Sequence, residues 1–191
     1  MHVPRVPVSP RCATLRDVSQ SEAKGARPRV VTVTVSDTRS AAEDGSGRAL
    51  AEELAAFDRV RHEIVPDEPE RIRALVEQLA RSGEVDAVVL TGGTGIAPRD
   101  GTVEALTPLF DKTLDGFGEA FRRLSWDEIG PRAILSRAVA GTVGRCLVVA
   151  LPGSEKAARL GARALVAPVL GHAVDLLAGR TKHGPRHGGG A

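Results

Sequence analysis

The feature that most constrains the fold is a short apolar run, residues 86–91 (DAVVLT), which leads directly into the glycine-rich segment 92–95 (GGTG). An apolar run of this length is typical of a strand that is buried on both faces, as in the middle of a parallel sheet. Residues 29–36 and 59–65 are two further β-rich stretches, and helical patterns separate the three. This alternation predicts crossover units, and therefore an α/β fold whose mostly parallel sheet is covered by helices on both faces.

The remaining chain continues the same pattern. We expect a helix that begins with Ser46 as its N-cap, and an amphipathic helix through residues 72–79 that ends at Ser82-Gly83. Helical pieces are predicted within 102–130, and a hairpin within 134–151 that turns at 141–144. A final helix should begin after 152–154, and Pro168 should split it from a last helix that ends at Leu177.

Length and charge indicate one globular domain with basic ends. The 191 residues are 42% hydrophobic and 26% charged, which is enough apolar material for a core. We assign residues 29–178 to a single domain, with disordered basic segments at 1–28 and 179–191. Residues 1–29 carry +4 and residues 179–191 carry +3, so the body is acidic although the whole chain is +2. Because aromatic residues make up only 3%, we expect no nucleic-acid partner.

Cysteine and histidine usage excludes several kinds of site. The two cysteines, Cys12 and Cys146, form no metal-binding or disulfide pattern, and Cys146 is interpreted as a small buried hydrophobe. The five histidines are too scattered for a zinc site or a Ser-His-Asp arrangement. No unbroken apolar run is long enough to span a bilayer, so we expect no membrane partner and a cytoplasmic location.

The segment 91–95 (TGGTG) is the strongest local signal for a binding site. Its three glycines permit positive φ angles and let main-chain amides approach an anion closely. Arg99 and Asp100 follow, and a helix is expected to begin near Thr102, so a phosphate and a metal ion could share this place. The plain structural alternative is a tight turn.

Other loops at predicted strand ends carry hydroxyl and acidic groups. They are Ser36-Asp37, residues 44–47 (DGSG), residues 66–68 (PDE) and residues 152–154 (PGS). The structural alternative for Ser46 and Asp67 is that each caps a helix, and for residues 152–154 it is an ordinary turn from a strand into a helix. Carboxylates beside glycine-rich loops suit Mg²⁺ and phosphate chemistry, in which catalysis consists of positioning and of neutralising negative charge.

Six blocks in one order resemble the MogA/MoaB family of molybdenum-cofactor biosynthesis proteins, over about residues 30–178. The longest is 91–100 (TGGTGIAPRD), followed by Thr102 and Glu104. The other blocks are 36–38 (SDT), 44–47 (DGSG), 66–68 (PDE), 116–119 (GFGE) and 151–154 (LPGS). Residues 117–125, 128–130 and 136–138 are more similar to the MoaB branch.

The resemblance implies a three-layer α/β/α fold with a small hairpin, and a homotrimer or a homohexamer made of two trimers. It also implies molybdopterin adenylyltransferase activity, in which ATP and molybdopterin give adenylylated molybdopterin and pyrophosphate with Mg²⁺. A molybdenum insertase would then receive the product. The same fold also serves in non-catalytic proteins, so a molybdopterin-binding carrier or assembly protein is the alternative.

The resemblance also implies roles for individual residues. Asp67 and Asp100 match functionally essential aspartates of the family, and we assign them as catalytic residues that hold Mg²⁺ and position charge. The residues expected to bind substrate are Ser36, Asp37, Ser46, Thr91, Gly92, Gly93, Thr94, Gly95, Pro152, Gly153 and Ser154.

Overall fold

A six-stranded sheet forms the centre of the fold in the computed structural model, which describes residues 26–180. Its order is β2-β1-β3-β6-β5-β4, and the first four strands run parallel while β5 and β4 are antiparallel to their neighbours. The strands are β1 (Arg29–Val35), β2 (Asp58–Val65), β3 (Ala87–Thr91), β4 (Lys112–Thr113), β5 (Val139–Val143) and β6 (Cys146–Leu151). The expectations for the two terminal segments and for Cys12 fall almost entirely outside the described residues.

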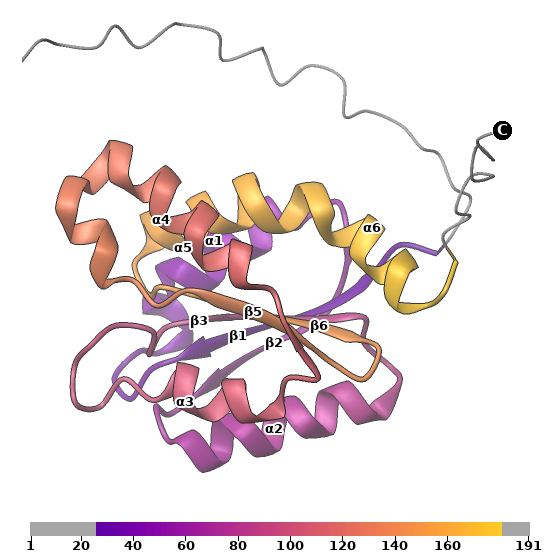
Figure 1. Cartoon of the computed structure of the whole chain (residues 1–191). Helices are drawn as coiled ribbons and strands as arrows, with labels where there is room; N and C mark the ends of the chain where they lie inside the picture. The colour runs from indigo at the N-terminus through magenta and orange to yellow at the C-terminus, as the bar shows by residue number, and fades with distance from the viewer. Residues whose placement is uncertain (1–25, 181–191) are drawn as a thin grey trace, which may run out of the picture.

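Helices cover both faces of this sheet, which confirms the predicted three-layer α/β/α class (Figure 1). One face carries α1 (Gly45–Glu53), α4 (Asp115–Ile129), α5 (Glu155–Gly161) and α6 (Ala167–Leu177). The other carries α2 (Pro69–Ser82) and the short α3 (Thr102–Leu106). Short 3₁₀ helices, η1 (Ala41–Glu43), η2 (Thr107–Leu109) and η3 (Gly130–Leu135), connect these elements.

The central strands are buried on both faces, as the sequence predicted. In β3, Ala87 and Val89 face the α1/α4/α5/α6 layer, while Val88 and Leu90 face α2 and α3. The same alternation divides β6 between the two layers. Two separate cores therefore lie above and below one sheet, and together they fix which loops end at the same edge.

The hairpin is confirmed, but its predicted turn at 141–144 is wrong. Strand β5 continues through Gly141, and the chain reverses at Gly144 and Arg145, where Gly144 has φ +58°. Gly141 serves a different purpose, because a Cβ there would lie 2.4 Å from the ring of Phe110. Glycine at position 141 leaves room for this aromatic ring, a requirement that the local sequence does not reveal.

Pro168 does not split the last helix, contrary to the prediction. Residues Glu155–Leu177 form one continuous helix that contains a π-helical turn, η4 (Ala162–Val166), just before the proline. The amide of Ala167 bonds to the carbonyl of Ala162, a wider i→i+5 closure that lets the helix pass a residue lacking an amide hydrogen.

This helix is the one element in the described region that is long and apolar enough to cross a membrane, judged by length and composition only. Its buried residues recur every four positions and pack on the sheet, which accounts for part of its apolar character. They are Ala158, Ala162, Val166, Leu170 and Val174.

The prediction of Ser46 as an N-cap is also wrong. Asp44 caps α1, since its Oδ1 accepts a hydrogen bond of 2.7 Å from the amide of Gly47. Ser46 lies in the first turn and is buried. The turn at 152–154 leads from β6 into α5 as expected, and Ser154 caps that helix, with its Oγ accepting from the amide of Ala157.

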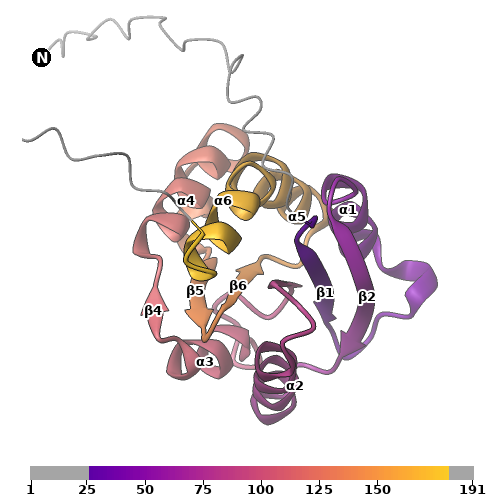
Figure 2. The ribbon, with the colours of Figure 1, turned by 90° about the vertical axis from the view of Figure 1, so that its right-hand side faces the viewer.

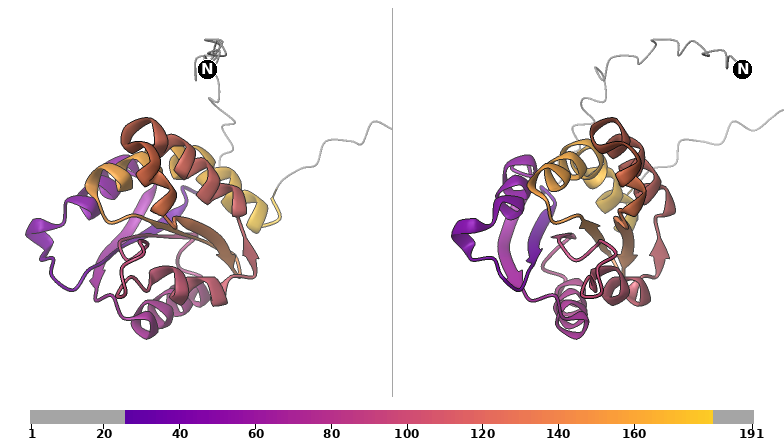
Figure 3. Two further views of the ribbon diagram at one scale, coloured as in Figure 1. Left: turned by 60° about the vertical axis from the view of Figure 1, so that its left-hand side comes forward. Right: turned by 90° about the vertical axis from the view of Figure 1, so that its left-hand side faces the viewer.

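The strand order determines where a ligand crevice lies. From β1 the chain moves to β2 on one side, and it then returns to β3 on the other side of β1. The loops that follow β1 and β3 therefore diverge at a topological switch point, where open α/β sheets bind ligands. The right panel of Figure 3 faces this edge, and the candidate site lies there.

Candidate functional site

Three strand-end loops are packed against one another through glycines. The amide of Gly92 donates to the carbonyl of Leu151 at 3.0 Å, which joins the β3 and β6 loops. Gly92 has φ +108°, and a Cβ on it would lie 2.2 Å from the carbonyl oxygen of Val35 at the end of β1. A Cβ on Gly153 would in turn lie 3.1 Å from Cα of Gly92. Glycine is therefore required for the three loops to meet.

These loops surround a cavity of about 370 Å³ at the switch point. Seven of the predicted site residues line it, and they come from four different strand-end segments. The seven are Ser36, Asp67, Gly92, Gly93, Asp100, Gly153 and Ser154; Val35, Thr38, Arg39 and Arg99 complete the lining.

Other predicted residues lie beside the cavity without lining it. The Thr91 hydroxyl donates to the carbonyl of Pro152 at 2.9 Å, which ties β3 to the following loop. Gly95 lies on the outer arm of its loop, where its carbonyl accepts from Arg137. The Thr94 hydroxyl is buried and has no hydrogen-bond partner among the described residues. The structure therefore gives Thr91 and Pro152 a supporting position rather than a place in the cavity wall.

Asp67 and Asp100, the two predicted catalytic residues, share this cavity. Oδ1 of Asp67 accepts from the amide of Gly101 at 3.1 Å, and Oδ2 of Asp100 accepts from the amide of Ala97 at 2.8 Å. Burial raises the pKa of Asp67, the charges of Asp100 and Asp37 raise it further, and the hydrogen bond from Gly101 opposes them. The alternative that Asp67 caps α2 is wrong, because its carboxylate bonds across to the β3–α3 loop.

Asp37 lies outside the cavity wall but organises its rim. Its Oδ1 accepts from the amide of Asp67 at 2.9 Å, and its Oδ2 lies 3.4 Å from Nη2 of Arg99. The rim therefore holds three carboxylates, two of which line the cavity, close to one exposed guanidinium. A ligand that brings positive charge to Asp67 and Asp100 would relieve their mutual repulsion.

Arg39 is a lining residue that the sequence interpretation missed. Its Nη2 donates to the carbonyl of Gly153 at 2.9 Å, and its Nη1 donates to Oγ of Ser46 at 2.6 Å. Ser46, predicted to bind substrate, thus lies one step behind the cavity. It donates to Oδ1 of the buried Asp44.

Asp44 is the centre of that supporting network. Burial alone would raise the pKa of Asp44, but hydrogen bonds from Thr34, Gly47, His62 and Ser46 hold it below its ordinary value. Nε2 of His62 lies 2.9 Å from Oδ2 of Asp44. Asp44 therefore fixes Ser46 behind the cavity, and Ser46 in turn helps to hold Arg39 at the cavity wall.

Arg137 is a second residue whose importance the sequence did not reveal. It comes from the segment before β5, yet it bonds to the loop after β3. Its Nε donates to the carbonyl of Gly95 at 2.8 Å, and its main-chain amide donates to the carbonyl of Thr94 at 3.2 Å. Its guanidinium also forms an ion pair with Glu104 on α3. Arg137 therefore clamps the loop that carries Asp100.

The residues present are compatible with Mg²⁺, provided that a ligand supplies further oxygens. Within residues 26–180, no three His, Cys, Asp or Glu side chains gather closely enough to hold a metal ion. Mg²⁺, however, is commonly bound by one or two carboxylates together with substrate phosphates and water. Asp67 and Asp100 supply that smaller donor set; the pKa of Asp67 is raised mainly by burial and then by the charges of Asp100 and Asp37, and a bound cation would oppose all three effects.

Comparison with known proteins identifies the class. A family model described as "Probable molybdopterin binding domain" matches residues 31–172. The molybdenum cofactor biosynthesis protein B of Bacillus subtilis (strain 168) is 44% identical over 163 residues, which is 82% of this chain and 96% of that protein. The protein of the same name from Staphylococcus carnosus is 46% identical over 152 residues, 76% of this chain and 88% of that protein. The chain therefore belongs to the MogA/MoaB family, and its role is in molybdenum cofactor biosynthesis.

Solved structures agree and indicate the branch. A crystal structure of a molybdenum cofactor biosynthesis protein B has a TM-score of 0.75 and 43% identity, covering 80% of this chain and 96% of that one. The tungsten cofactor synthesizing protein MoaB of Pyrococcus furiosus has a TM-score of 0.70 and 37% identity, covering 81% of this chain and 98% of that one. The Mog protein of Mycobacterium ulcerans has a TM-score of 0.71 and 33% identity, covering 81% of this chain and 99% of that one. By sequence identity, the chain is more similar to these two MoaB proteins than to this Mog protein.

Proposed function

We propose that this protein catalyses adenylyl transfer from ATP to molybdopterin in the cytoplasm. The observation that carries the proposal is that Asp67 and Asp100 line one cavity together with the main chain of Gly92 and Gly93. Two carboxylates beside a close-approach glycine loop suit a reaction in which several phosphate groups must meet.

The proposed reaction forms one bond and breaks one. An oxygen of the molybdopterin phosphate attacks the α-phosphorus of ATP, and the bond between that phosphorus and the bridging oxygen to the β-phosphate breaks. Pyrophosphate leaves with that oxygen and its electron pair. Because the attacking phosphate is already ionised, no general base is required, and catalysis consists of alignment and neutralisation of charge.

The chain's own residues supply alignment and part of the charge. Arg39 and Arg99 place cationic groups in the cavity lining, where they would contact phosphate oxygens. Gly92 and Gly93 leave their main chain accessible, because side chains at these positions would collide with Val35 and Asp67. Asp67 and Asp100 would hold Mg²⁺, which supplies electrostatic stabilisation of the negative charge on the transferring phosphate.

The test is pyrophosphate release from ATP with molybdopterin and saturating Mg²⁺. We expect Asp67→Asn and Asp100→Asn each to lower kcat/KM on the order of a hundredfold. Asp58→Asn, at the exposed start of β2, is the matched control and should have wild-type turnover. Absence of turnover, together with molybdopterin binding that is indifferent to Mg²⁺ and to Asp100→Asn, would instead establish the non-catalytic carrier.

We also propose the assembly that the family resemblance implies, a homotrimer or a pair of trimers, with a molybdenum insertase as the acceptor of the product. Large apolar side chains exposed at the end of α4 and in η3 support an assembly surface. They are Trp126, Ile129, Ile134 and Leu135. Light scattering after size-exclusion chromatography tests this, and Trp126→Glu should shift the particle toward monomer.

A further inference from the structure

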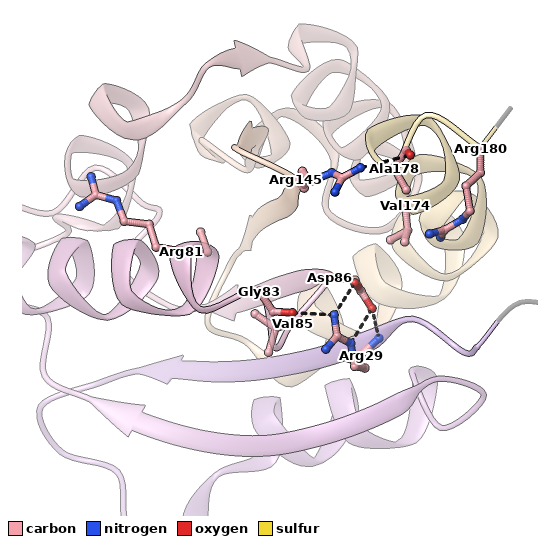
Figure 4. Close-up of a pocket in the computed structure, with 10 residues that line it drawn as sticks. Arg29, Arg81, Gly83, Val85, Asp86, Arg145, Val174, Ala178 and Arg180 are labelled. Carbon is pink, nitrogen blue, oxygen red and sulfur yellow. Dashed lines mark hydrogen bonds and ion pairs between the residues drawn. The ribbon is translucent and has the colours of Figure 1, made fainter.

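A second polar cavity lies at the opposite edge of the sheet, where β1 and β3 begin. Its volume is about 400 Å³, and Figure 2 faces the end of the molecule that contains it. The lining comes from the start of β1, the end of α2, the segment between α2 and β3, the β5–β6 turn and the end of α6 (Figure 4). None of its lining residues belongs to the cavity of the candidate site.

Four arginines and a single acid are the charged residues of this lining. The arginines are Arg29, Arg81, Arg145 and Arg180, and the acid is Asp86. Arg81 extends away from the other three in Figure 4 and lies 3.7 Å from Glu77, one turn earlier on α2. Arg29, Arg145 and Arg180 therefore remain as the arginines around the centre of the pocket.

Arg29 and Asp86 form the fixed floor of the pocket. Nε and Nη2 of Arg29 donate to the Asp86 carboxylate at 3.2 and 3.0 Å, and Nη2 also donates to the carbonyl of Gly83 at 2.9 Å. Asp86 accepts a further bond, from the Arg29 amide at 2.8 Å. Asp86 is therefore paired chiefly with Arg29, and the charge of Arg180 makes a smaller contribution to the lowered pKa of Asp86.

Arg145 and Arg180 retain unused donors. Arg145 has no acidic partner among residues 26–180; it donates to the carbonyls of Leu177 and Ala178 at 3.4 and 3.3 Å, from Nε and Nη2. Arg180 contacts Asp175 through Nε at 2.9 Å. This leaves Nη1 of Arg145 and both terminal nitrogens of Arg180 without a hydrogen-bond acceptor in the described part of the chain. An exposed ion pair such as Arg180–Asp175 contributes little and exchanges its carboxylate readily for another anion.

We propose that this pocket binds a multiply charged phosphate anion, either free pyrophosphate or the phosphate chain of a nucleotide, through Arg145 and Arg180 above the Arg29–Asp86 floor. Planar guanidinium groups match phosphate oxygens with paired hydrogen bonds. The lining has no aromatic residue on which a nucleobase could stack, so the phosphate chain is the part recognised. This site is independent of the proposed adenylyl transfer, which uses the opposite edge.

Calorimetric titration of the full chain with inorganic pyrophosphate, at low salt and without Mg²⁺, tests the proposal. We expect Arg145→Gln/Arg180→Gln to weaken binding at least about tenfold. The control Arg73→Gln/Arg163→Gln removes the same charge from exposed positions on α2 and η4 outside the pocket, and should leave the affinity within about twofold. Ala178→Asp retains all the arginines but places a carboxylate in the lining, and it should also weaken binding at least about tenfold.

Repeating the titration with ATP distinguishes the two sources of the phosphate. If the pocket double variant binds both ATP and pyrophosphate more weakly than wild type, the pocket accepts the phosphate chain of a nucleotide as well as the free anion. If only pyrophosphate binding is weakened, the pocket accepts the free anion alone. Equal weakening by the pocket double variant and the control double variant would overturn the proposal, as would wild-type protein that binds no pyrophosphate. Neither result would alter the turnover assay that tests adenylyl transfer.

Discussion

Nη2 of Arg137 lies 3.3 Å from the main-chain carbonyl of Asp100, so a residue next to β5 holds the last turn before α3. The same side chain bonds to the carbonyl of Gly95 on the other arm of the loop. The carboxylate of Asp100 therefore reaches the cavity from a loop that is held on its far side by the guanidinium of Arg137. The position of Asp100 depends on that guanidinium bonding to both arms of the loop at once.

We predict that Arg137→Ala lowers kcat/KM for the proposed adenylyl transfer roughly tenfold or more, because a small misplacement of Asp100 would disturb phosphate alignment. Arg137→Lys keeps the charge but not the fork, and should recover only part of the loss. Steady-state kinetics measure the effect, and hydrogen exchange of the amides in 94–101 should accelerate in both variants. Unchanged exchange with reduced activity would indicate that Arg137 acts on the substrate directly.

Gly92 should be far less tolerant of substitution than a glycine that needs only its φ angle. Gly83 has φ +68° with no neighbour within 4 Å of a Cβ, so Gly83→Ala should lower the free energy of unfolding by about 1 kcal/mol. Gly92→Ala adds a clash 2.2 Å from the Val35 carbonyl, and should cost roughly 3 kcal/mol. Urea unfolding of the two variants at one protein concentration measures the difference. Equal losses would show that the three loops separate easily.

Cys146 should be chemically inert while the protein is folded. Burial raises the pKa of its thiol to about 12, the charge of Asp86 raises it as well, and so almost no thiolate exists near neutral pH. In a Cys12→Ser background, we expect a disulfide reagent at pH 8 to label Cys146 only after denaturant is added. Rapid labelling of the native protein would contradict the buried position of β6.

The sequence allowed the edge of the sheet that carries the site to be predicted. Parallel strands bring their carboxyl ends together, so the hydroxyl and acidic residues that follow β1, β2, β3 and β6 had to converge. The glycine cluster predicted close approach of main chains, and Gly92 and Gly93 provide it. These features follow from the local sequence pattern and from the general handedness of crossover connections, so a single sequence is enough to predict them.

What the sequence could not provide depends on contacts between distant segments. Arg39 and Arg137 resemble any loop arginine until the fold brings Gly153 beside one and Gly95 beside the other. Ser46 matched an N-cap pattern, but Asp44 took that position because its carboxylate also bonds to Thr34 on β1. Gly141 appeared to be a turn residue because the ring of Phe110, which requires the space, lies on a separate connection.

The raised pKa of Asp67 predicts a specific effect of pH on stability. Burial is the largest cause, followed among the raising effects by the charges of Asp100 and Asp37. As pH rises above the ordinary carboxyl pKa of about 3.9, the unfolded chain releases its proton first, so the folded state loses stability through that window. Below it, both states are protonated and no penalty remains.

Asp67→Asn removes this penalty, since an amide stays neutral while its oxygen still accepts from Gly101. We therefore expect the variant to have a higher thermal midpoint than wild type at pH 7, with the gain disappearing near pH 3, although it should be impaired in the proposed adenylyl transfer. Asp58→Asn, on an exposed carboxylate, should show no gain that depends on pH. A gain of equal size at both pH values would mean that packing, rather than the crowding of carboxylates at the cavity, controls the stability of this edge.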